Sequence, residues 1–327
     1  MIISQTPLRV SFAGGGSDLP AFYRKYGGAV VSTAIDKFVY VGVNKKFDDS
    51  IRVSYSRTEE VATVDQIEHQ LVREALRMLS IPGGIEITSI ADIPSRGTGM
   101  GSSSSFAVGL LHALHAYRQE YISAEALGDE SCRLEIERCG DRIGKQDQYA
   151  AACGGFNLIE FHQDDAVSVR PIICDREMVA ELQRWLMMFY TGVTRRAGSI
   201  LDNQTEAMEN DERKQAMVRE MVDLARQLCN ELHRNRLESF GEILHQNWEL
   251  KKTLVDGISN PEIEGWYQCA RSQGAIGGKL LGAGAGGFLL FFVPPYRQNA
   301  VREALSALRE VPFGFERRGS RIILFQQ

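Results

Sequence analysis

The chain has 327 residues, enough for two packed domains, and its 44% hydrophobic and 24% charged residues are ordinary for a globular protein. A net charge of -5 and the lack of a long basic block give no support to nucleic-acid binding. The longest apolar run, Phe288–Val293, is far shorter than the roughly 20 residues that span a bilayer. We therefore expect no nucleic-acid partner and no membrane partner.

The ends of the chain and its cysteines bear on the compartment. The N-terminus lacks the charged and apolar regions of a signal peptide. The six cysteines form no CxxC pair, so we expect buried reduced thiols rather than structural zinc. Both observations favour a cytoplasmic protein.

The first elements are predicted from apolar periodicity. Leu8, Val10 and Phe12 alternate with polar residues, which predicts a strand over 7–13 that ends at a glycine loop. The pattern then predicts one or two strands in 29–44, a strand over 51–55, a helix over 65–79 and a strand over 85–90.

The segment Pro94–Ser105 is a run of glycine and serine that leads directly into a helix reaching about Tyr117. A serine near its start is expected to cap the helix, and the glycines would let backbone amides crowd around one point. Free amides at a positive helix end form an anion site, for which phosphate is the natural occupant. The alternative is a flexible surface loop.

The rest of the chain is predicted to form two further groups of elements. Ser123 would cap a helix through Arg138, and a strand follows over 154–161. After a polar turn at Gln163–Asp165 we expect a strand over 186–190 and helices near 197–209, 212–233 and 236–254. The last quarter is predicted as helix 262–272, strands 275–281 and 287–293, helix 298–309 and strand 321–326. That order resembles a βαββ unit, and it gives an α+β protein with domains 1–170 and 171–327.

Three glycine loops, at Gly14–Gly16, Gly97–Gly101 and Gly282–Gly287, are candidates for a phosphate site. None fits the Walker A pattern. The last loop fits GxGxxG by letter, but a strand follows it, whereas a dinucleotide fingerprint must open a helix. That loop is therefore either a ligand contact or a structural turn.

Two acidic residues follow the central helix and could serve phosphoryl transfer. Glu137 could offer a hard oxygen to a divalent cation, and Asp147 could take a proton from an attacking hydroxyl. Lys145 and Arg9 could keep such an aspartate ionised. The alternative for Glu137 is a solvated residue on a helix.

The order of these motifs resembles the GHMP kinases. The matching segments are Pro7-Leu-Arg-Val to Asp18, Pro94–Ser105, Gly144-Lys-Gln-Asp147 and Lys279–Gly287. Met100 stands for a leucine of the family motif, and Ala285 replaces one glycine. The resemblance implies an N-terminal domain like ribosomal protein S5 and a ferredoxin-like C-terminal βαββ domain. If Ala285 needs a positive φ, it carries a strain of about 1 kcal/mol.

The resemblance also implies roles for individual residues, with ATP and Mg²⁺ as cofactors. Asp147 would accept the proton of the sugar hydroxyl, and Arg9 would orient Asp147. Mg²⁺ would be held by Ser103 and Glu137, with Ser102 or Ser104 as alternatives to the serine. The ATP-binding residues implied are Gly97, Gly99, Met100, Gly101, Ser102, Ser103 and Ser104. The substrate-binding residues implied are Gly15, Gly16, Asp18, Thr191, Gly192, Arg195 and Gly284.

Within the family, four segments resemble the kinases that phosphorylate the anomeric hydroxyl of a heptose 7-phosphate. They are Pro7–Pro20, Gly144–Ala152, Tyr190–Arg195 and Ala275–Gly282. The implied partner is a small phosphosugar, and a homodimer stays open. Arg195 would hold the sugar phosphate, because a guanidinium can grip phosphate through two bonds. Arg24, Arg96, Lys251 and Lys252 are alternatives for that phosphate. A kinase of another sugar such as fucose, and a non-catalytic regulator that binds sugar and ATP, are alternative functions.

Overall fold

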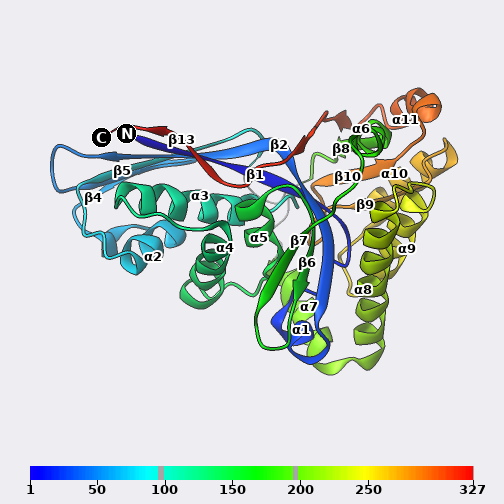
Figure 1. Cartoon of the computed structure of the whole chain (residues 1–327), viewed down its shortest axis with the longest axis horizontal. Helices are drawn as coiled ribbons and strands as arrows, with labels where there is room; N and C mark the ends of the chain where they lie inside the picture. Colours follow the sequence, from blue (N-terminus) through cyan, green and yellow to red (C-terminus); the bar gives the residue numbers. More distant parts are fainter. Residues whose placement is uncertain (95–98, 194–197, 327) are drawn as a thin grey trace.

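The computed structural model describes residues 1–94, 99–193 and 198–326 (Figure 1). Its first half holds most of one large sheet and the helices beneath it. In chain order these elements are β1 (Ile2–Ala13), α1 (Pro20–Tyr26), β2 (Gly28–Lys45), β3 (Ile51–Ser54), β4 (Thr58–Val61), η1 (Val64–Gln66), α2 (Gln70–Met78), β5 (Ile85–Ala91), α3 (Ser102–Tyr117), α4 (Ala124–Cys132), η2 (Arg133–Arg138), α5 (Gln146–Cys153), β6 (Phe156–Phe161) and β7 (Val167–Pro171).

The second half is richer in helix and carries a smaller sheet. Its elements are α6 (Arg176–Trp185), β8 (Leu186–Tyr190), α7 (Gly198–Asn210), α8 (Glu212–His233), α9 (Phe240–Lys252), α10 (Pro261–Ser272), β9 (Gly277–Leu280), β10 (Phe288–Phe292), η3 (Pro295–Arg297), α11 (Gln298–Ala304), β11 (Arg309–Glu310), β12 (Phe315–Glu316) and β13 (Arg321–Phe325).

The long strand β2 organises the larger sheet. Among the described residues this sheet has nine strands, and its main path runs β13-β1-β2-β5-β3-β4. One half of β2 pairs with β5 and the other half pairs with β6, so a single strand serves both ends of the sheet. The register between β1 and β2 shifts between Pro7 and Leu8, and the ribbon of β2 bends sharply in Figure 1. The bend carries the end of β1 toward the C-terminal half.

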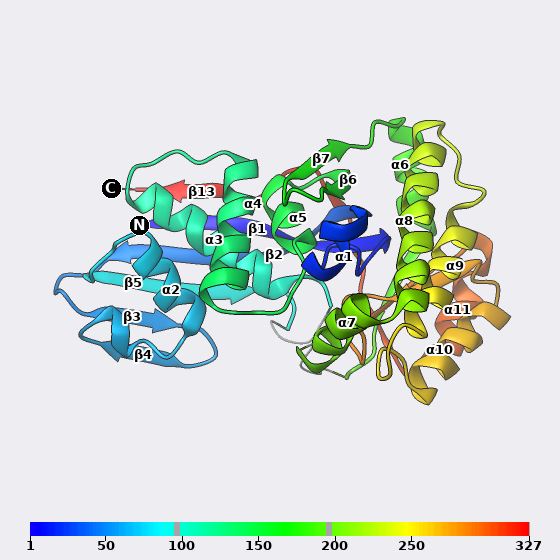
Figure 2. The same cartoon turned by 90° about the horizontal axis from the view of Figure 1, so that it is seen from below.

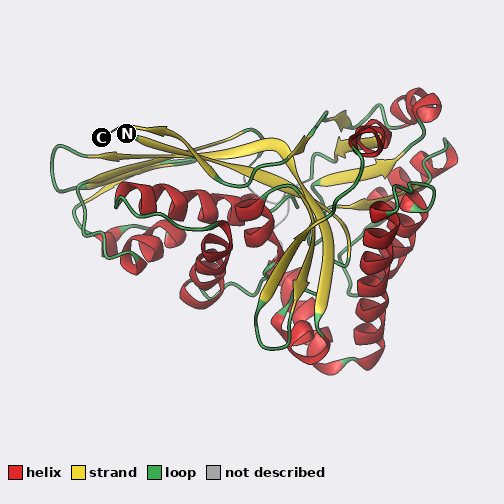
Figure 3. Ribbon diagram, in the orientation of Figure 1, coloured by secondary structure: helices red, strands yellow, loops and turns green. Residues whose placement is uncertain are grey.

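Helix α3 packs closely against β1 and β2, on the one face of the sheet that helices cover in this half (Figure 3). Leu110, Leu111 and Leu114 are fully buried there, and each contributes roughly 1.5–3 kcal/mol to the hydrophobic stabilisation. Gly109 lets α3 approach β1 closely, since a Cβ at this position would lie 2.7 Å from Thr6 Oγ1. Ser4 Oγ donates a hydrogen bond of 2.7 Å to the carbonyl of Gly109. The hydroxyl of Ser105 donates to the carbonyl of Pro7 at 2.9 Å. The start of α3 is therefore fixed relative to β1.

The smaller sheet has the order β11-β8-β10-β9 and is antiparallel throughout. The strand predicted over 321–326 forms as β13, but it pairs with β1 in the larger sheet, and β12 pairs with β2. The expectation that this strand completes a C-terminal βαββ unit is wrong, because the chain returns to the free edge of β1. Both termini consequently lie side by side (Figures 1 and 2). The division at residue 170 stays a prediction.

Three predicted helices differ in detail from the structure. The helix predicted over 65–79 begins only at Gln70, because Val64–Gln66 forms a separate 3-10 turn with a capping box at Thr63. The hydroxyl of Ser123 caps α4 as predicted, but after Cys132 the helix continues as the π-helix η2. Helix α11 ends at Ala304, five residues before the predicted end.

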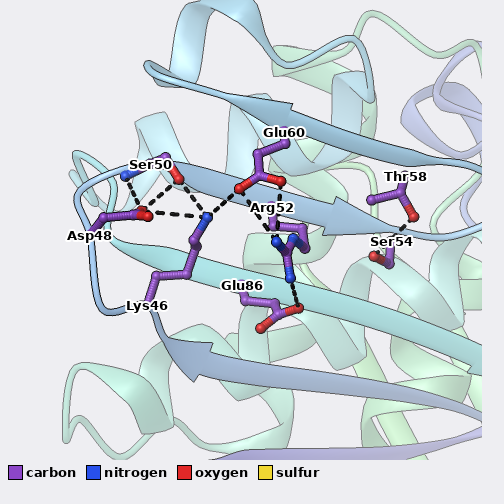
Figure 4. A network of polar contacts seen from close by, with 8 residues as sticks. All are labelled: Lys46, Asp48, Ser50, Arg52, Ser54, Thr58, Glu60 and Glu86. Atoms are coloured by element: carbon purple, nitrogen blue, oxygen red, sulfur yellow. Dashed lines mark hydrogen bonds and ion pairs between the residues drawn. The ribbon is translucent and has the colours of Figure 1, made fainter.

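A polar network closes the outer end of the larger sheet (Figure 4). Lys46, at the end of β2, contacts Glu60 of β4 at 2.7 Å. Arg52 of β3 links Glu60 at 3.2 Å to Glu86 of β5 at 3.4 Å. The side chains of Arg52 and Glu60 are 41% and 51% exposed, so we expect their ion pair to set strand register more than to add stability.

The contact at Gly109 generates a test of the packing of α3. A Cβ added to Gly109 would lie 2.7 Å from Thr6 Oγ1 and 3.2 Å from Ser4 Oγ, both buried and hydrogen-bonded. Gly109→Ala should therefore lower the free energy of unfolding by about 1–3 kcal/mol in denaturant titrations. Gly265→Ala, in α10 with no atom within 4 Å, is the control and should raise it by about 0.5–1 kcal/mol. An equal gain in both variants would contradict the close approach.

Candidate functional site

Two of the glycine loops meet backbone to backbone. A Cβ on Gly99 would lie 2.2 Å from the carbonyl oxygen of Leu281, and one on Gly282 would lie 2.2 Å from the Cα of Gly99. Both glycines have positive φ, at 74° and 78°. Segments almost two hundred residues apart are thus joined at one point, and only glycine permits that distance.

The Gly282–Gly287 loop also contacts Ile258. Gly284 packs against Ile258, since a Cβ there would lie 2.6 Å from the Cα of that residue. Ala285 has a φ of 67° and donates its N–H to the carbonyl of Ile258 at 2.9 Å. Ala285 therefore does adopt the left-handed conformation, with a strain of about 1 kcal/mol.

The loop that contains Gly99 ends at the N-terminus of α3. Gly101 is the N-cap residue with a φ of 73°, and no side chain caps the helix. The expectation of a serine cap is wrong, because Ser102 is already the first helical residue. Ser102 and Ser104 are buried, whereas Ser103 is exposed. The first N–H groups of an α-helix carry its positive end, so the start of α3 suits an anion.

A buried ion pair joins this loop to the predicted base. Arg9 donates to both carboxylate oxygens of Asp147, at 2.7 Å and 2.8 Å, and to the carbonyl of Gly99 at 2.7 Å. The Arg9 residue is only 4% exposed, while the Asp147 side chain is 26% exposed. A Cβ on Gly101 would lie 3.1 Å from Asp147 Oδ2, so the carboxylate sits directly beside the start of α3. Arg9 and Asp147 are thus together as expected, whereas Lys145 contacts Asp165 instead.

The structure places Glu135, and not the predicted metal ligand Glu137, beside Ser103. Glu137 is exposed on η2, while Glu135 is fully buried and faces the start of α3. Ser103 Oγ donates to Glu135 Oε1 at 3.2 Å, and Gln148 donates to Oε2 at 2.6 Å. The two glutamates are two residues apart and so lie on different helix faces. A four-residue spacing in the sequence, Leu127, Ser131 and Glu135, marks the buried face and could have identified Glu135.

The donor set at Glu135 fits a hard cation such as Mg²⁺. Burial raises the pKa of Glu135 to about 7, and hydrogen bonds from Ser104, Gln148 and Ser103 oppose that rise. A cation beside the carboxylate would favour its ionised form. Mg²⁺ is commonly held by one or two carboxylates together with substrate phosphates, so Glu135 alone could supply the carboxylate of such a site.

Asp18 lies next to Asp147, where a substrate could reach both. Its Oδ1 accepts the N–H of Gly16 at 3.0 Å, and its Oδ2 accepts the N–H of Gln146 at 3.4 Å. Gly144 is required here, since a Cβ would lie 1.9 Å from Asp18 Oδ2. Burial raises the pKa of Asp18, the Asp147 carboxylate raises it further, and Lys251 opposes both.

Some predicted binding residues lie elsewhere or cannot be placed. Arg96, Gly97 and Arg195 lie outside the described residues. Thr191 is buried, and its hydroxyl donates to the carbonyl of Gly287 at 3.0 Å, which ties it to the Gly282–Gly287 loop. Arg24 pairs with Asp165 on the surface, so it does not face Asp147.

A small-molecule kinase needs a phosphate site, a base and a metal ligand. The start of α3, the Asp147 carboxylate beside Arg9 and the buried Glu135 could supply them. The described residues include no helix long and apolar enough to cross a membrane. The profile "GHMP kinases N terminal domain" matches residues 66–155, and "GHMP kinases C terminal" matches 221–310. The chain belongs to the GHMP kinases, and it has their two-domain fold.

Three relatives indicate which members of the family the chain resembles. D-glycero-α-D-manno-heptose 7-phosphate kinase of Campylobacter jejuni is 30% identical over 93% of each chain. L-fucokinase/L-fucose-1-P guanylyltransferase of Bacteroides fragilis is 27% identical over 92% of this chain but only 35% of that longer protein. The crystal structure of a D-glycero-D-manno-heptose 1-phosphate kinase from Bacteroides thetaiotaomicron has a TM-score of 0.82, with 26% identity over the whole of both chains. The chain is a sugar kinase of this family.

The two glutamates allow a matched test of the metal site. Glu135→Gln should raise the Mg²⁺ concentration for half-maximal ADP formation by at least about 10-fold, because it removes the buried carboxylate. Glu137→Gln, at an exposed position of the same π-helix, should leave that concentration unchanged. Glu135 is not the metal ligand if Glu137→Gln raises this Mg²⁺ concentration and Glu135→Gln leaves it unchanged.

The contact between the glycine loops can be tested in the same way. Gly282→Ala and Gly257→Ala both place a side chain at positive φ, but Gly257 has no atom within 4 Å of its added Cβ. Both should share a strain of about 1 kcal/mol, and Gly282→Ala should lose about 1–3 kcal/mol more in denaturant unfolding. Equal losses would show that Gly99 and Gly282 do not touch in solution.

Proposed function

We propose that this kinase phosphorylates the anomeric hydroxyl of D-glycero-α-D-manno-heptose 7-phosphate with ATP, and that the product is the 1,7-bisphosphate. The observation that carries the proposal is the partly exposed Asp147 carboxylate, held by Arg9 beside the open end of α3. That arrangement brings a base and a phosphate site to one place. Similarity to the heptose 7-phosphate kinase of Campylobacter jejuni supports the choice of sugar, and we place the reaction in nucleotide-heptose biosynthesis.

In the proposed reaction the protein binds and orients two substrates. The backbone amides of Gly99–Ser104 would hold the ATP phosphates at the positive end of α3. Asp147 would take the proton of the anomeric hydroxyl while its oxygen forms a bond to the γ-phosphorus. The bond from the γ-phosphorus to the bridging oxygen of ADP then breaks, and ADP leaves with that electron pair.

Arg9 has a positioning role in this proposal. Its two bonds to Asp147 fix both carboxylate oxygens, and its third bond fixes the carbonyl of Gly99. Arg9 would therefore keep the distance between Asp147 and the Gly99 backbone fixed while the substrates bind. Ser103 and Glu135 would hold Mg²⁺, which when bound would neutralise charge on the ATP phosphates.

A cluster of aromatic rings near the start of α3 is our candidate for the adenine site. The rings of Tyr55 and His69 lie 4.7 Å apart, and those of His69 and Phe106 lie 5.3 Å apart. Phe106 directly follows the four serines and is partly exposed. A purine could pack against these rings while its phosphates reach the glycine loop.

Fucose is the second candidate for the sugar, because the Bacteroides fragilis relative named as a fucokinase aligns with 92% of this chain. The two sugars differ in charge, since only the heptose carries a phosphate. An anion site on the sugar side of Asp147 favours the heptose, and its absence favours fucose. A regulator that binds sugar and ATP without turnover fits poorly with an intact Arg9–Asp147 pair.

A coupled ADP-release assay with heptose 7-phosphate, sugar 6-phosphates, free heptose and fucose tests the proposal. ADP should form with heptose 7-phosphate at the highest kcat/KM. Fastest turnover of fucose would replace the heptose assignment, and no ADP with any sugar would end the kinase proposal.

Replacement of the base gives a second, independent measurement. Asp147→Asn keeps the size of the side chain but removes its basicity, so kcat should fall by roughly 10²–10⁴-fold. Binding of ATP, measured by calorimetry, should change little, because the amides of α3 remain. A kcat within a few-fold of the wild type would mean that Asp147 only positions the sugar.

A further inference from the structure

A buried lysine lies on the sugar side of the site without a counter-ion in contact. Lys251, in the last turn of α9, is 7% exposed. A Cβ on Gly15 would lie 3.3 Å from its Nζ, so the ammonium rests against the first glycine loop. Within the described part of the chain, no hydrogen-bond or ion-pair partner of this ammonium is found. Burial lowers the pKa of Lys251, and the nearby carboxylates of Asp18 and Asp147 oppose that shift.

The position of Lys251 is fixed by its own helix. Figure 2 shows the end of β1 beside α8 and α9. One turn before Lys251, the side-chain oxygen of Asn247 accepts the N–H of Gly14 at 3.0 Å. This bond sets α9 against the loop, so the ammonium of Lys251 is held next to Gly15.

The charged groups that face Lys251 already have partners of their own. Arg9 is engaged by Asp147 and Gly99, and both oxygens of Asp18 accept backbone N–H groups. Lys279, only 2% exposed, donates to the carbonyl of Phe12 at 3.2 Å, and burial lowers its pKa well below the usual range. Three buried basic side chains therefore face two carboxylates. A buried ammonium without a counter-ion is costly, so this region is suited to an incoming anion.

We propose that Lys251 binds the phosphate of the phosphosugar substrate. The inference rests on the proposed function, which requires a phosphate on the sugar, and it assigns the residue that recognises it. Gly15 has a part in this, because any side chain there would occupy the space beside the ammonium. Asp18 would contact the hydroxyls of the same sugar, while Lys251 selects for its charge.

Lys252 provides a matched control on the same helix. Its ammonium is paired with Glu249 at 2.8 Å and with Glu264 at 3.0 Å, so it is already neutralised outside the site. The experiment compares Lys251→Met and Lys252→Met by steady-state kinetics with heptose 7-phosphate and with unphosphorylated heptose. Lys251→Met should raise KM for the 7-phosphate by about 10- to 100-fold, because it removes a charge-assisted contact. Its KM for the free sugar and its KM for ATP should stay within a few-fold, and Lys252→Met should resemble the wild type.

A binding measurement separates this inference from the proposed function. Calorimetry with heptose 7-phosphate, without ATP, should give a Kd that is weakened as much as KM in Lys251→Met. Gly15→Ala, which crowds the ammonium without removing it, should weaken binding by a smaller factor. A circular dichroism spectrum and melting curve would verify that each variant folds.

The outcomes are distinct. If the wild type binds heptose 7-phosphate but forms no ADP, the proposed function fails while the Kd still tests Lys251. If ADP forms but Lys251→Met weakens the free sugar and the 7-phosphate equally, Lys251 does not recognise phosphate. No change of KM or Kd in a folded Lys251→Met protein would likewise overturn the inference.

Discussion

The bidentate pair between Arg9 and Asp147 is the interaction on which the rest of the site depends. Arg9 comes from β1, Asp147 from the first turn of α5, and the third bond of Arg9 reaches Gly99 in the loop before α3. Because Arg9 is almost fully buried, it would be costly to leave any of these acceptors unpaired. The bend of the larger sheet and the packing of α3 on β1 both serve to place these three segments together.

Close backbone contacts have a second organising role. Gly99 against Gly282 and Gly144 against Asp18 are approaches that a Cβ would prevent, and a Cβ on Gly101 would crowd Asp147. They join loops from both halves of the chain around one small volume. Ala285 is the exception that accepts strain, since the chain keeps it at positive φ while its N–H bonds to Ile258.

Buried ionisable groups with shifted pKa values gather around this same volume. Burial raises the pKa of Asp18 and of Glu135, and it lowers the pKa of Lys251 and of Lys279. Such groups are costly for the empty protein and are common where a charged substrate or cation binds. Lys251 lies against Gly15 and Glu135 lies beside Ser103, which agrees with the sugar and metal sites that we propose.

Much of the site could be predicted from the sequence, because its parts are local motifs: the glycine–serine run before α3, the first strand with Arg9, and the short segment with Asp147. The family resemblance and most elements followed from the same patterns. Only the tertiary structure shows that Glu135, and not Glu137, is buried beside Ser103, because the packing of η2 determines which face is buried. It also decided that β13 returns to β1 and that Lys251, not Lys252, faces the first glycine loop. Strand pairing and the orientation of a helix depend on contacts between distant segments, which the order of residues along one segment does not specify.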